Sequence, residues 1–348
     1  MTRRQVVQKI IGPLALPQNE RGEAFAASNI ALCKYWGKRD NELNLPQNSS
    51  LSLSLGHLGT HTIIQANAAK DEIYLNKENL GPSARFSSRL IAFLDLFRPM
   101  PDYFFRIETH NNFPTAAGLA SSASGYAAMA KALNAFFGWR LDDINLSILA
   151  RLGSGSAARS VYTGFVEWHR GEAEDGMDSY AEQLPASWPE LRLAVLTVSG
   201  AAKSIDSRGG MRRTVETSTL YKAWPEKATR DIEAIRQAIR EHDFERLGST
   251  AESNALAMHA TMLDSQPAIL YWLPETVSVF HKIWRLRQEG VPLYFTIDAG
   301  PNVKILLEEK NEGIVRSEFC EAEIVNPFIF NRVNHFPESA SGERRTAR

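Results

Sequence analysis

Cysteine is scarce in this chain: its 348 residues include only Cys33 and Cys320. The two are far apart and give neither a C-x-x-C pair nor the spacing of a metal site, so we predict a reducing, cytoplasmic compartment. An excess of charge is also missing, since 39 Lys and Arg residues balance 40 Asp and Glu residues. This balance argues against nucleic acid or an anionic membrane as the main partner, and any anion site must therefore be local.

Long apolar runs are absent as well. No stretch of 18 apolar residues occurs, so the sequence predicts no membrane-spanning helix. The N-terminal segment is basic and then apolar, like a weak signal peptide, but Pro13 and Pro17 interrupt it and no clear cleavage site follows. We interpret residues 1–24 as a flexible or lightly docked extension and residues 336–348 as a polar, frayed tail.

Several well-known catalytic motifs do not occur. The eight histidines form no H-E-x-x-H pattern, which disfavours a histidine metal site. His259 lies in an apolar helical stretch and is predicted to be a core histidine. The chain also has no G-x-S-x-G elbow, and Gly118 and Gly125 have the spacing of neither a Walker-type phosphate loop nor a G-x-G-x-x-G fingerprint.

The most informative segment is NNFPTAAGLASSASG at residues 111–125, which opens into an apolar-periodic helix. Its small residues let a phosphate approach the backbone, and the helix start supplies unpaired N–H groups and the positive end of the macrodipole. The hydroxyls of Ser121 and Ser122 could reach a metal ion or a phosphate oxygen. A capped helix with small-residue packing is an alternative of equal weight.

The hydrophobic pattern predicts an α+β fold in two domains. Strands are expected at residues 25–64, 102–109, 160–168, 191–200 and 293–298. Helices are expected at residues 84–97, 126–137, 142–152, 214–239, 243–262 and 275–289, the fourth with a break near Pro225. A Pro-rich interruption near residue 187 divides an N-terminal domain, 25–187, from a C-terminal domain, 188–335.

Four further segments combine charged, hydroxyl and glycine residues. KYWGKRD follows a strand and suits a small anionic ligand, although a solvated turn explains it equally well. In GSGSAARS, Ser156 and Arg159 are three residues apart and would share one helix face. Arg159 could bind a carboxylate or phosphate there, or it could simply face solvent. Asp298 ends an apolar strand in TIDAGPNVK, where it either shapes a turn or serves as a base. AAKSIDSRGGM is either a mobile anion-binding loop or an ordinary surface loop.

Taken together, these strings resemble the diphosphomevalonate decarboxylases of the GHMP kinase superfamily. The matching stretches are KYWGKRDNELNLPQNSSLS, NNFPTAAGLASSASGYAA, GSGSAARS with GFVEW, MHATML and TIDAGPNVKIL. They occur in the family's order and cover most of residues 25–310. The resemblance implies an N-terminal domain with a left-handed βαβ unit, a ferredoxin-like C-terminal domain, an active site in the cleft between them, and a homodimer.

The resemblance also implies a reaction. ATP, with Mg²⁺, would phosphorylate the 3-hydroxyl of mevalonate 5-diphosphate, and loss of this phosphate with CO₂ would give isopentenyl diphosphate in the mevalonate pathway of isoprenoid and sterol biosynthesis. Such enzymes are carboxy-lyases. Alternatives within the family are a decarboxylase of mevalonate 5-phosphate and a mevalonate 3-kinase-like enzyme, and outside it an inactive sensor of ATP and a ligand.

Residue roles carry over position by position. Asp298 would orient or deprotonate the 3-hydroxyl, Arg159 would hold the substrate carboxylate, and Lys34 would stabilise charge at the reacting centre. The implied substrate-binding residues are Tyr35, Trp36, Lys38, Arg85, Ser154, Ser156 and Ser207. The implied ATP-binding residues are Gly118, Leu119, Ala120, Ser121, Ser122 and Lys203, with Ser122 near Mg²⁺. This chain departs from many members at residues 206–211, where DSRGGM changes the charge near the phosphates and puts the substrate's phosphorylation state in question.

Overall fold

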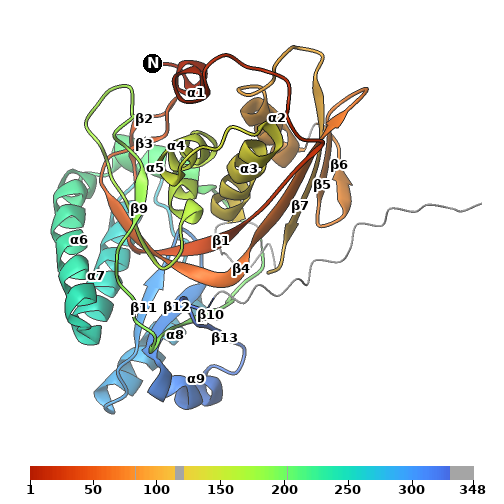
Figure 1. The fold of residues 1–348 in the computed structure, drawn as a ribbon. Helices are drawn as coiled ribbons and strands as arrows, with labels where there is room; N and C mark the ends of the chain where they lie inside the picture. Colours follow the sequence, from red (N-terminus) through yellow and green to blue (C-terminus); the bar gives the residue numbers. More distant parts are fainter. Residues whose placement is uncertain (83, 114–120, 202, 330–348) are drawn as a thin grey trace, which may run out of the picture.

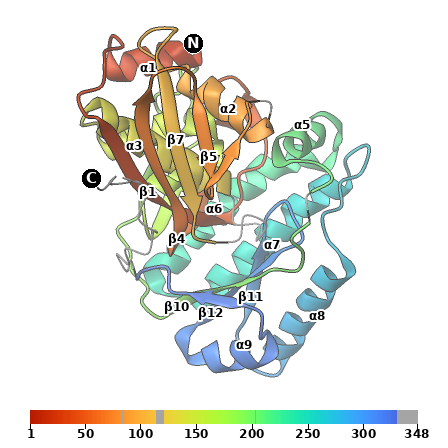
Figure 2. The ribbon, with the colours of Figure 1, turned by 90° about the vertical axis from the view of Figure 1, so that its right-hand side faces the viewer.

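The computed structural model describes residues 1–82, 84–113, 121–201 and 203–329. Two sheets and the helices that pack on them make up the fold (Figures 1 and 2). The larger sheet has the strand order β6-β5-β7-β4-β8-β9, with β1 also paired to β4. Its strands are β1 (Arg21–Cys33), β4 (Ser50–Asn67), β5 (Glu72–Leu75), β6 (Glu78–Leu80), β7 (Phe104–Asn111), β8 (Phe165–Trp168) and β9 (Ala181–Gln183). A short separate hairpin joins β2 (Lys38–Asp40) to β3 (Leu45–Pro46).

Helices cover one face of the larger sheet (Figure 1). They are α2 (Arg85–Leu94), α3 (Ser121–Phe137), α4 (Asp143–Gly153) and the 3-10 helix η1 (Gly155–Val161). The central helix α3 packs on β1 and β4 through a face rich in alanine, which allows close approach of helix and sheet. β5 and β7 are parallel neighbours with α2 in their connection, the βαβ unit expected here, whose handedness stays a prediction.

The N-terminal segment is ordered, so our expectation of a flexible or lightly docked extension is wrong. Helix α1 (Arg3–Ile11) begins with a capping box in which Thr2 and Gln5 bond each other's backbone. Val6 and Val7 are fully buried in the same core as α3 and α4. Val6 and Val7 therefore belong to the core of the folded domain, whereas the basic residues Arg4 and Lys9 face solvent.

The smaller sheet has the order β11-β12-β10-β13, and each neighbouring pair is antiparallel. Its strands are β10 (Leu191–Leu196), β11 (Tyr294–Ile297), β12 (Val303–Glu308) and β13 (Glu323–Val325). The packed helices are α6 (Trp224–Glu241), α7 (Phe244–Leu263), α8 (Pro274–Gln288) and α9 (Glu312–Glu318). The order β-α-β-β-α-β, with the first strand between the third and the fourth, is the ferredoxin-like arrangement that was expected.

The helix expected at residues 214–239, with a break near Pro225, is divided a few residues before that proline. Helix α5 (Ser207–Thr217) begins at the capping residue Asp206, and a short turn, η2 (Leu220–Ala223), separates it from α6. Pro225 lies in the first turn of α6. Its missing N–H costs nothing there, because a backbone N–H at that position would have no acceptor within the helix. The DSRGG segment is therefore the start of a helix and not the loop that its glycines suggested.

The two sheets share one hydrophobic core. Leu32 and Trp36 from the first sheet's side pack in the same cluster as Leu193 and Ile235 from the second. Gly37 lies at this junction with φ +97°, and a Cβ there would stand 1.8 Å from Tyr221 Oη. Tyr221 Oη in turn donates to the carbonyl of Trp36 at 3.0 Å, so the strand end after β1 is fixed against the C-terminal helices.

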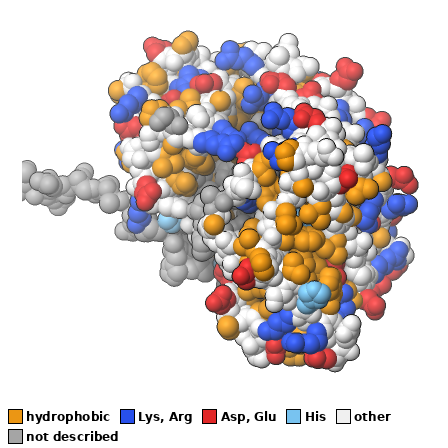
Figure 3. Space-filling view, turned by 180° about the vertical axis from the view of Figure 1, so that it is seen from behind, with side chains coloured by type: hydrophobic (Ala, Val, Ile, Leu, Met, Phe, Trp, Pro, Cys, Tyr) orange, Lys and Arg blue, Asp and Glu red, His pale blue; other side chains and the backbone are white. Residues whose placement is uncertain are grey.

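The face opposite that of Figure 1 carries a wide hydrophobic area, with Lys and Arg side chains gathered above it (Figure 3). Within the described ranges, no helix has both the length and the apolar character needed to cross a membrane.

Candidate active site

A cavity of about 770 Å³ lies where the two domains meet. Its walls include most of the residues predicted to form the site. These are Lys34, Tyr35, Trp36, Lys38, Arg85, Ser121, Ser122, Ser154, Ser156, Arg159, Lys203, Ser207 and Asp298. The remaining predicted residues, Gly118, Leu119 and Ala120, lie outside the described residues. The cavity thus gathers residues from six separate stretches of the chain.

Two strand ends create the centre of this cavity. Lys34 follows the last residue of β1, and Asp298 follows the last residue of β11, so both side chains leave a rigid strand at the same place. Lys34 Nζ lies 2.7 Å from Asp298 Oδ1 and also donates to the carbonyl of Ala31 at 2.8 Å. The backbone N–H of Lys34 donates to Asn254 Oδ1 at 2.8 Å, which fixes the lysine against α7. The pair joins the two domains at the base of the cavity.

Lysines surround the Asp298 carboxylate. Burial alone would raise the pKa of Asp298, but Lys34, Lys304 and Lys203 together lower it to about 2. Lys304 Nζ is 3.9 Å from Asp298 Oδ2, and burial lowers the pKa of Lys304 to about 8 despite the carboxylate. Burial likewise lowers the pKa of Lys34, against the attraction of Asp298. Asp298 is therefore ionised at any pH near neutrality, and positive charge surrounds it.

Arg159 is held rigidly in the 3-10 helix η1. Its side chain is almost fully buried, with Nη1 donating to Ser50 Oγ at 2.5 Å and Nε donating to Asn29 Oδ1 at 3.2 Å. Burial lowers the pKa of Arg159 to about 10, partly offset by Asp298, so the guanidinium stays charged. Because two of its groups are already anchored to strands β1 and β4, the arginine presents a fixed cation to the cavity.

Two aromatic residues of the cavity wall each carry one polar side-chain atom. Tyr35 Oη and Trp36 Nε1 are buried, and neither has a hydrogen-bond partner within the part of the chain that the structure describes. Buried polar atoms of this kind are costly unless something bonds them. Both residues line the cavity that also holds Lys34 and Arg159, but these two atoms are covered and are not exposed to it.

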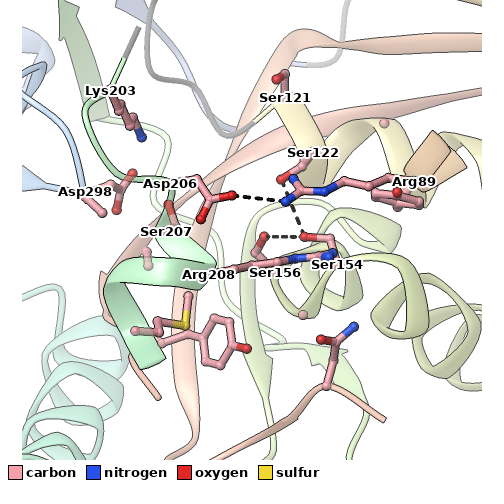
Figure 4. Close-up of a pocket in the computed structure, with 18 of the residues that line it drawn as sticks. Arg89, Ser121, Ser122, Ser154, Ser156, Lys203, Asp206, Ser207, Arg208 and Asp298 are labelled. Atoms are coloured by element: carbon pink, nitrogen blue, oxygen red, sulfur yellow. Dashed lines mark hydrogen bonds and ion pairs between the residues drawn. The ribbon is translucent and has the colours of Figure 1, made fainter. Parts of the chain in front are cut away.

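The start of α3 lines another part of the cavity. Ser121 and Ser122 are its first two residues, and Ser122 Oγ lies 3.5 Å from Ser154 Oγ, which lies 3.4 Å from Ser156 Oγ (Figure 4). Hydroxyls and unpaired N–H groups at a helix start suit phosphate oxygens. Among the described residues, no three His, Cys, Asp or Glu side chains are grouped to hold a metal ion. Mg²⁺ that binds with a nucleotide usually needs no such group, because the phosphates and water supply most of its oxygen ligands.

A second group of cations lies around Asp206. Arg89 Nη2 donates to Asp206 Oδ2 at 3.0 Å, and Arg85 bonds the same oxygen. Arg208 and Lys38 line the same cavity, and Arg208 Nη2 donates to the carbonyl of Gly153 at 2.7 Å. The cavity thus has a lysine-rich centre at Asp298 and an arginine-rich end at Asp206.

Sequence reasoning missed some members of this site. Lys304 was detectable, because it is the only charged residue in the apolar run of β12, VKILL, and is fully buried there. Arg89 gave no signal beyond lying one helical turn from Arg85. His259 is buried as predicted, but its Nε2 also lies 3.1 Å from the backbone oxygen of Asp298, and burial lowers the pKa of this histidine to about 3.

Comparisons with known proteins agree with this geometry. Residues 26–181 match the diphosphomevalonate decarboxylase-like N-terminal domain, and residues 193–335 match the mevalonate 5-diphosphate decarboxylase C-terminal domain. A curated diphosphomevalonate decarboxylase from Gibberella zeae is 36% identical, covering 93% of this chain and 88% of the relative. The one from Homo sapiens is 42% identical, covering 80% of this chain and 75% of the relative.

Solved structures point the same way. Mevalonate diphosphate decarboxylase from Staphylococcus aureus superposes with a TM-score of 0.83 at 39% identity, covering 88% of this chain and 95% of that one. MDDEF in complex with MVAPP, AMPPCP and magnesium has a TM-score of 0.83 at 40% identity, covering 88% of this chain and 96% of that one. The two-domain fold defines a GHMP-type protein, and its cavity holds both the start of α3 and the Lys34–Asp298 pair. Within this class, the chain belongs to the diphosphomevalonate decarboxylase family.

Proposed function

We propose that the protein catalyses the ATP-dependent decarboxylation of mevalonate 5-diphosphate, giving isopentenyl diphosphate, ADP, phosphate and CO₂. The observation that carries this proposal is the ionised Asp298, 2.7 Å from the buried Lys34, in the same cavity as Arg159 and the start of α3. One cavity thus offers an acceptor for a hydroxyl, cations for a carboxylate and phosphates, and a helix start for a nucleotide. The family relationship supports the same reaction.

Asp298 orients the 3-hydroxyl in this scheme. A carboxylate whose pKa is about 2 is a weak base but a good hydrogen-bond acceptor, so it aims the hydroxyl oxygen at the γ-phosphate of ATP. Transfer forms the O–P bond at the 3-oxygen and breaks the bond to ADP, and the hydroxyl proton passes toward the carboxylate as that bond forms. Lys34 and Lys203 stabilise the negative charge on the moving phosphoryl oxygens.

Arg159 controls the second half of the reaction. Its anchored guanidinium holds the substrate carboxylate so that the C–C bond to be broken is aligned with the C–O bond to the leaving phosphate. The C–C electron pair forms the alkene as CO₂ leaves, and the phosphate departs with the C–O pair. No protein nucleophile is needed, so position and charge supply the rate.

The nucleotide would lie at the other wall of the cavity. Ser121, Ser122 and the start of α3 face the phosphates, and Lys203 reaches the γ-phosphate. Mg²⁺, held by the phosphate oxygens with Ser122 nearby, supplies charge neutralisation between the phosphates. Tyr35, Trp36, Lys38, Ser154, Ser156, Ser207 and Arg85 complete the substrate side of the cavity.

The family relationship favours this reaction over a second candidate, the decarboxylation of mevalonate 5-phosphate, and one feature of the cavity bears on the choice between them. Asp206 forms ion pairs with Arg85 and Arg89. Part of the positive charge that a second phosphate would use is therefore neutralised in the unliganded protein. We also propose that the enzyme works in the cytoplasm as a homodimer, on the strength of the family relationship. Light scattering of the purified protein tests the dimer.

The deciding experiment supplies the protein with ATP, Mg²⁺ and, separately, mevalonate, its 5-phosphate and its 5-diphosphate, and measures ADP and CO₂ together. Equal ADP and CO₂ with the 5-diphosphate supports the main proposal, and equal signals with the 5-phosphate alone transfer it to the second candidate. ADP without CO₂ would make the protein a 3-kinase. Silence with all three would refute the proposal and favour an inactive binding protein.

A further inference from the structure

Asp206 has an unusual position in the cavity. It is the residue before α5, where Oδ1 accepts the backbone N–H of Gly209 at 2.8 Å and caps the helix. Its other oxygen, Oδ2, accepts from Arg89 at 3.0 Å and from Arg85. Figure 4 shows the carboxylate turned away from Asp298 and toward Arg89. One carboxylate thus caps a helix of the C-terminal domain and binds two arginines from a helix, α2, of the N-terminal domain.

This carboxylate is the counter-charge of a crowded group of cations. Arg85, Arg89, Arg208 and Lys38 all line the same cavity. Burial is the main cause that lowers the pKa of Lys38 to about 8, and the charges of Arg208, Arg3 and Arg89 add to it. The arginines are partly exposed, with 70% of the Arg85 side chain and 39% of the Arg89 side chain accessible, so a ligand can reach both.

We infer that Asp206 is a specificity-determining residue that competes with the phosphates at the 5-end of the substrate for Arg85 and Arg89. This inference rests on the proposed function, because it assigns the arginine-rich end of the cavity to those phosphates. A substrate whose reacting hydroxyl lies at Asp298 has its opposite end free to reach this group. To bind there, the phosphates must displace the carboxylate from the arginines.

The competition penalises a diphosphate more than a monophosphate, because two phosphates can use both of the arginines that Asp206 binds, whereas one phosphate uses fewer of their N–H groups. Asp206→Asn removes the charge but keeps a residue that caps helices well. We expect this variant to lower KM for mevalonate 5-diphosphate by about five- to tenfold and KM for the 5-phosphate by only about two- to threefold, with kcat nearly unchanged. The preference for the diphosphate therefore rises.

Two variants separate this effect from a change in folding. Asp243→Asn is the matched control, because Asp243 caps α7 through the N–H of Arg246 at 3.0 Å and does not line the cavity. It should leave both KM values unchanged. In an Arg85→Gln/Arg89→Gln background, the Asp206→Asn exchange should lose its effect on selectivity, because the groups for which it competes are gone.

A binding measurement without turnover makes the inference independent of the reaction. Isothermal titration with inorganic pyrophosphate and with inorganic phosphate should show the larger gain in affinity for pyrophosphate in Asp206→Asn, and no such gain in the double-arginine background. Equal gains for both anions, or no gain, would overturn the inference. If wild-type protein turns over none of the mevalonate compounds while the pyrophosphate effect persists, the proposed function fails and the assignment of Asp206 as the competing anion stands.

Discussion

Replacing Asp298 with asparagine removes one charge from the centre of the cavity and keeps the size of the side chain. Lys34 Nζ, 2.7 Å away, and Lys304 Nζ, 3.9 Å away, lose their common anion. The 3-hydroxyl of the substrate loses its strongest acceptor. We therefore expect Asp298→Asn to lose most of its turnover and to keep its binding of ATP.

The expected loss of turnover and the expected loss of folding stability are estimated separately. A positioned acid–base group contributes about 10²–10⁴-fold to a rate, which corresponds to roughly 3–5 kcal/mol of activation free energy. The lowered pKa of Asp298, about 2 against 3.8, corresponds to about 2 kcal/mol of folding free energy, as an upper value because the side chain is 28% exposed. That contribution is fully present above pH 3.8 and is lost as the pH falls toward 2.

The assay combines steady-state release of ADP and CO₂ with nucleotide titration and urea unfolding at pH 7. Turnover should fall about 10²–10⁴-fold, the Kd for ATP should change less than about twofold, and the free energy of unfolding should decrease by about 2 kcal/mol or less. Asp243→Asn, at a helix cap away from the cavity, is the control. Near-native turnover in Asp298→Asn would refute the role given to this carboxylate.

Three other substitutions test the structure. Arg159→Lys should lower kcat by about 100-fold, because a lysine cannot bond Ser50, Asn29 and the substrate carboxylate together, and ADP release measured against CO₂ release will show which half-reaction is slowed. Val7→Ala should lower the free energy of unfolding by about 1–3 kcal/mol in urea titrations, since Val7 is fully buried, and an unchanged value would mean that α1 adds no stability. Gly37→Ala should reduce both stability and turnover, because the new Cβ meets Tyr221 at a positive φ, and a native melting temperature would contradict this contact.

Much of the fold was predictable because local rules dominate it. The alternation in SLSLSL belongs to β4, and the capping residues Asp142 and Asp243 begin helices within one residue of the expected positions. The errors have physical causes. The break expected near Pro225 lies a few residues earlier, because the backbone turns at Ser218 and η2 precedes α6, whereas apolar periodicity continues through this segment and does not mark the turn.

The α1 error arose differently. A short basic segment with two prolines resembles a disordered tail, and only the tertiary contacts of Val6 and Val7 make it a helix.

Most candidate site residues were predictable from motifs, but their partners were not. Strand ends rich in charged residues, such as those at Lys34 and Asp298, are visible in the sequence. The contact between them joins positions 264 apart, and nothing local encodes it. The bond from Asp206 to Arg89, 117 positions away, is of the same kind, which is why residues 206–211 appeared only as an altered loop. Roles assigned to individual residues remain predictions that the variants above test.

The core shared by the two domains has a consequence for biosynthesis. Trp224 Nε1 donates to the carbonyl of Trp36, a partner 188 positions earlier in the chain. At about 5–20 residues per second, a ribosome needs roughly 10–40 s to make the intervening chain. During that interval, Leu32 and Trp36 have no C-terminal helices to cover them. The N-terminal half therefore emerges with an apolar surface that must wait for α6 and α7, so chaperone supply during translation, rather than the stability of the finished enzyme, would limit its yield at high expression.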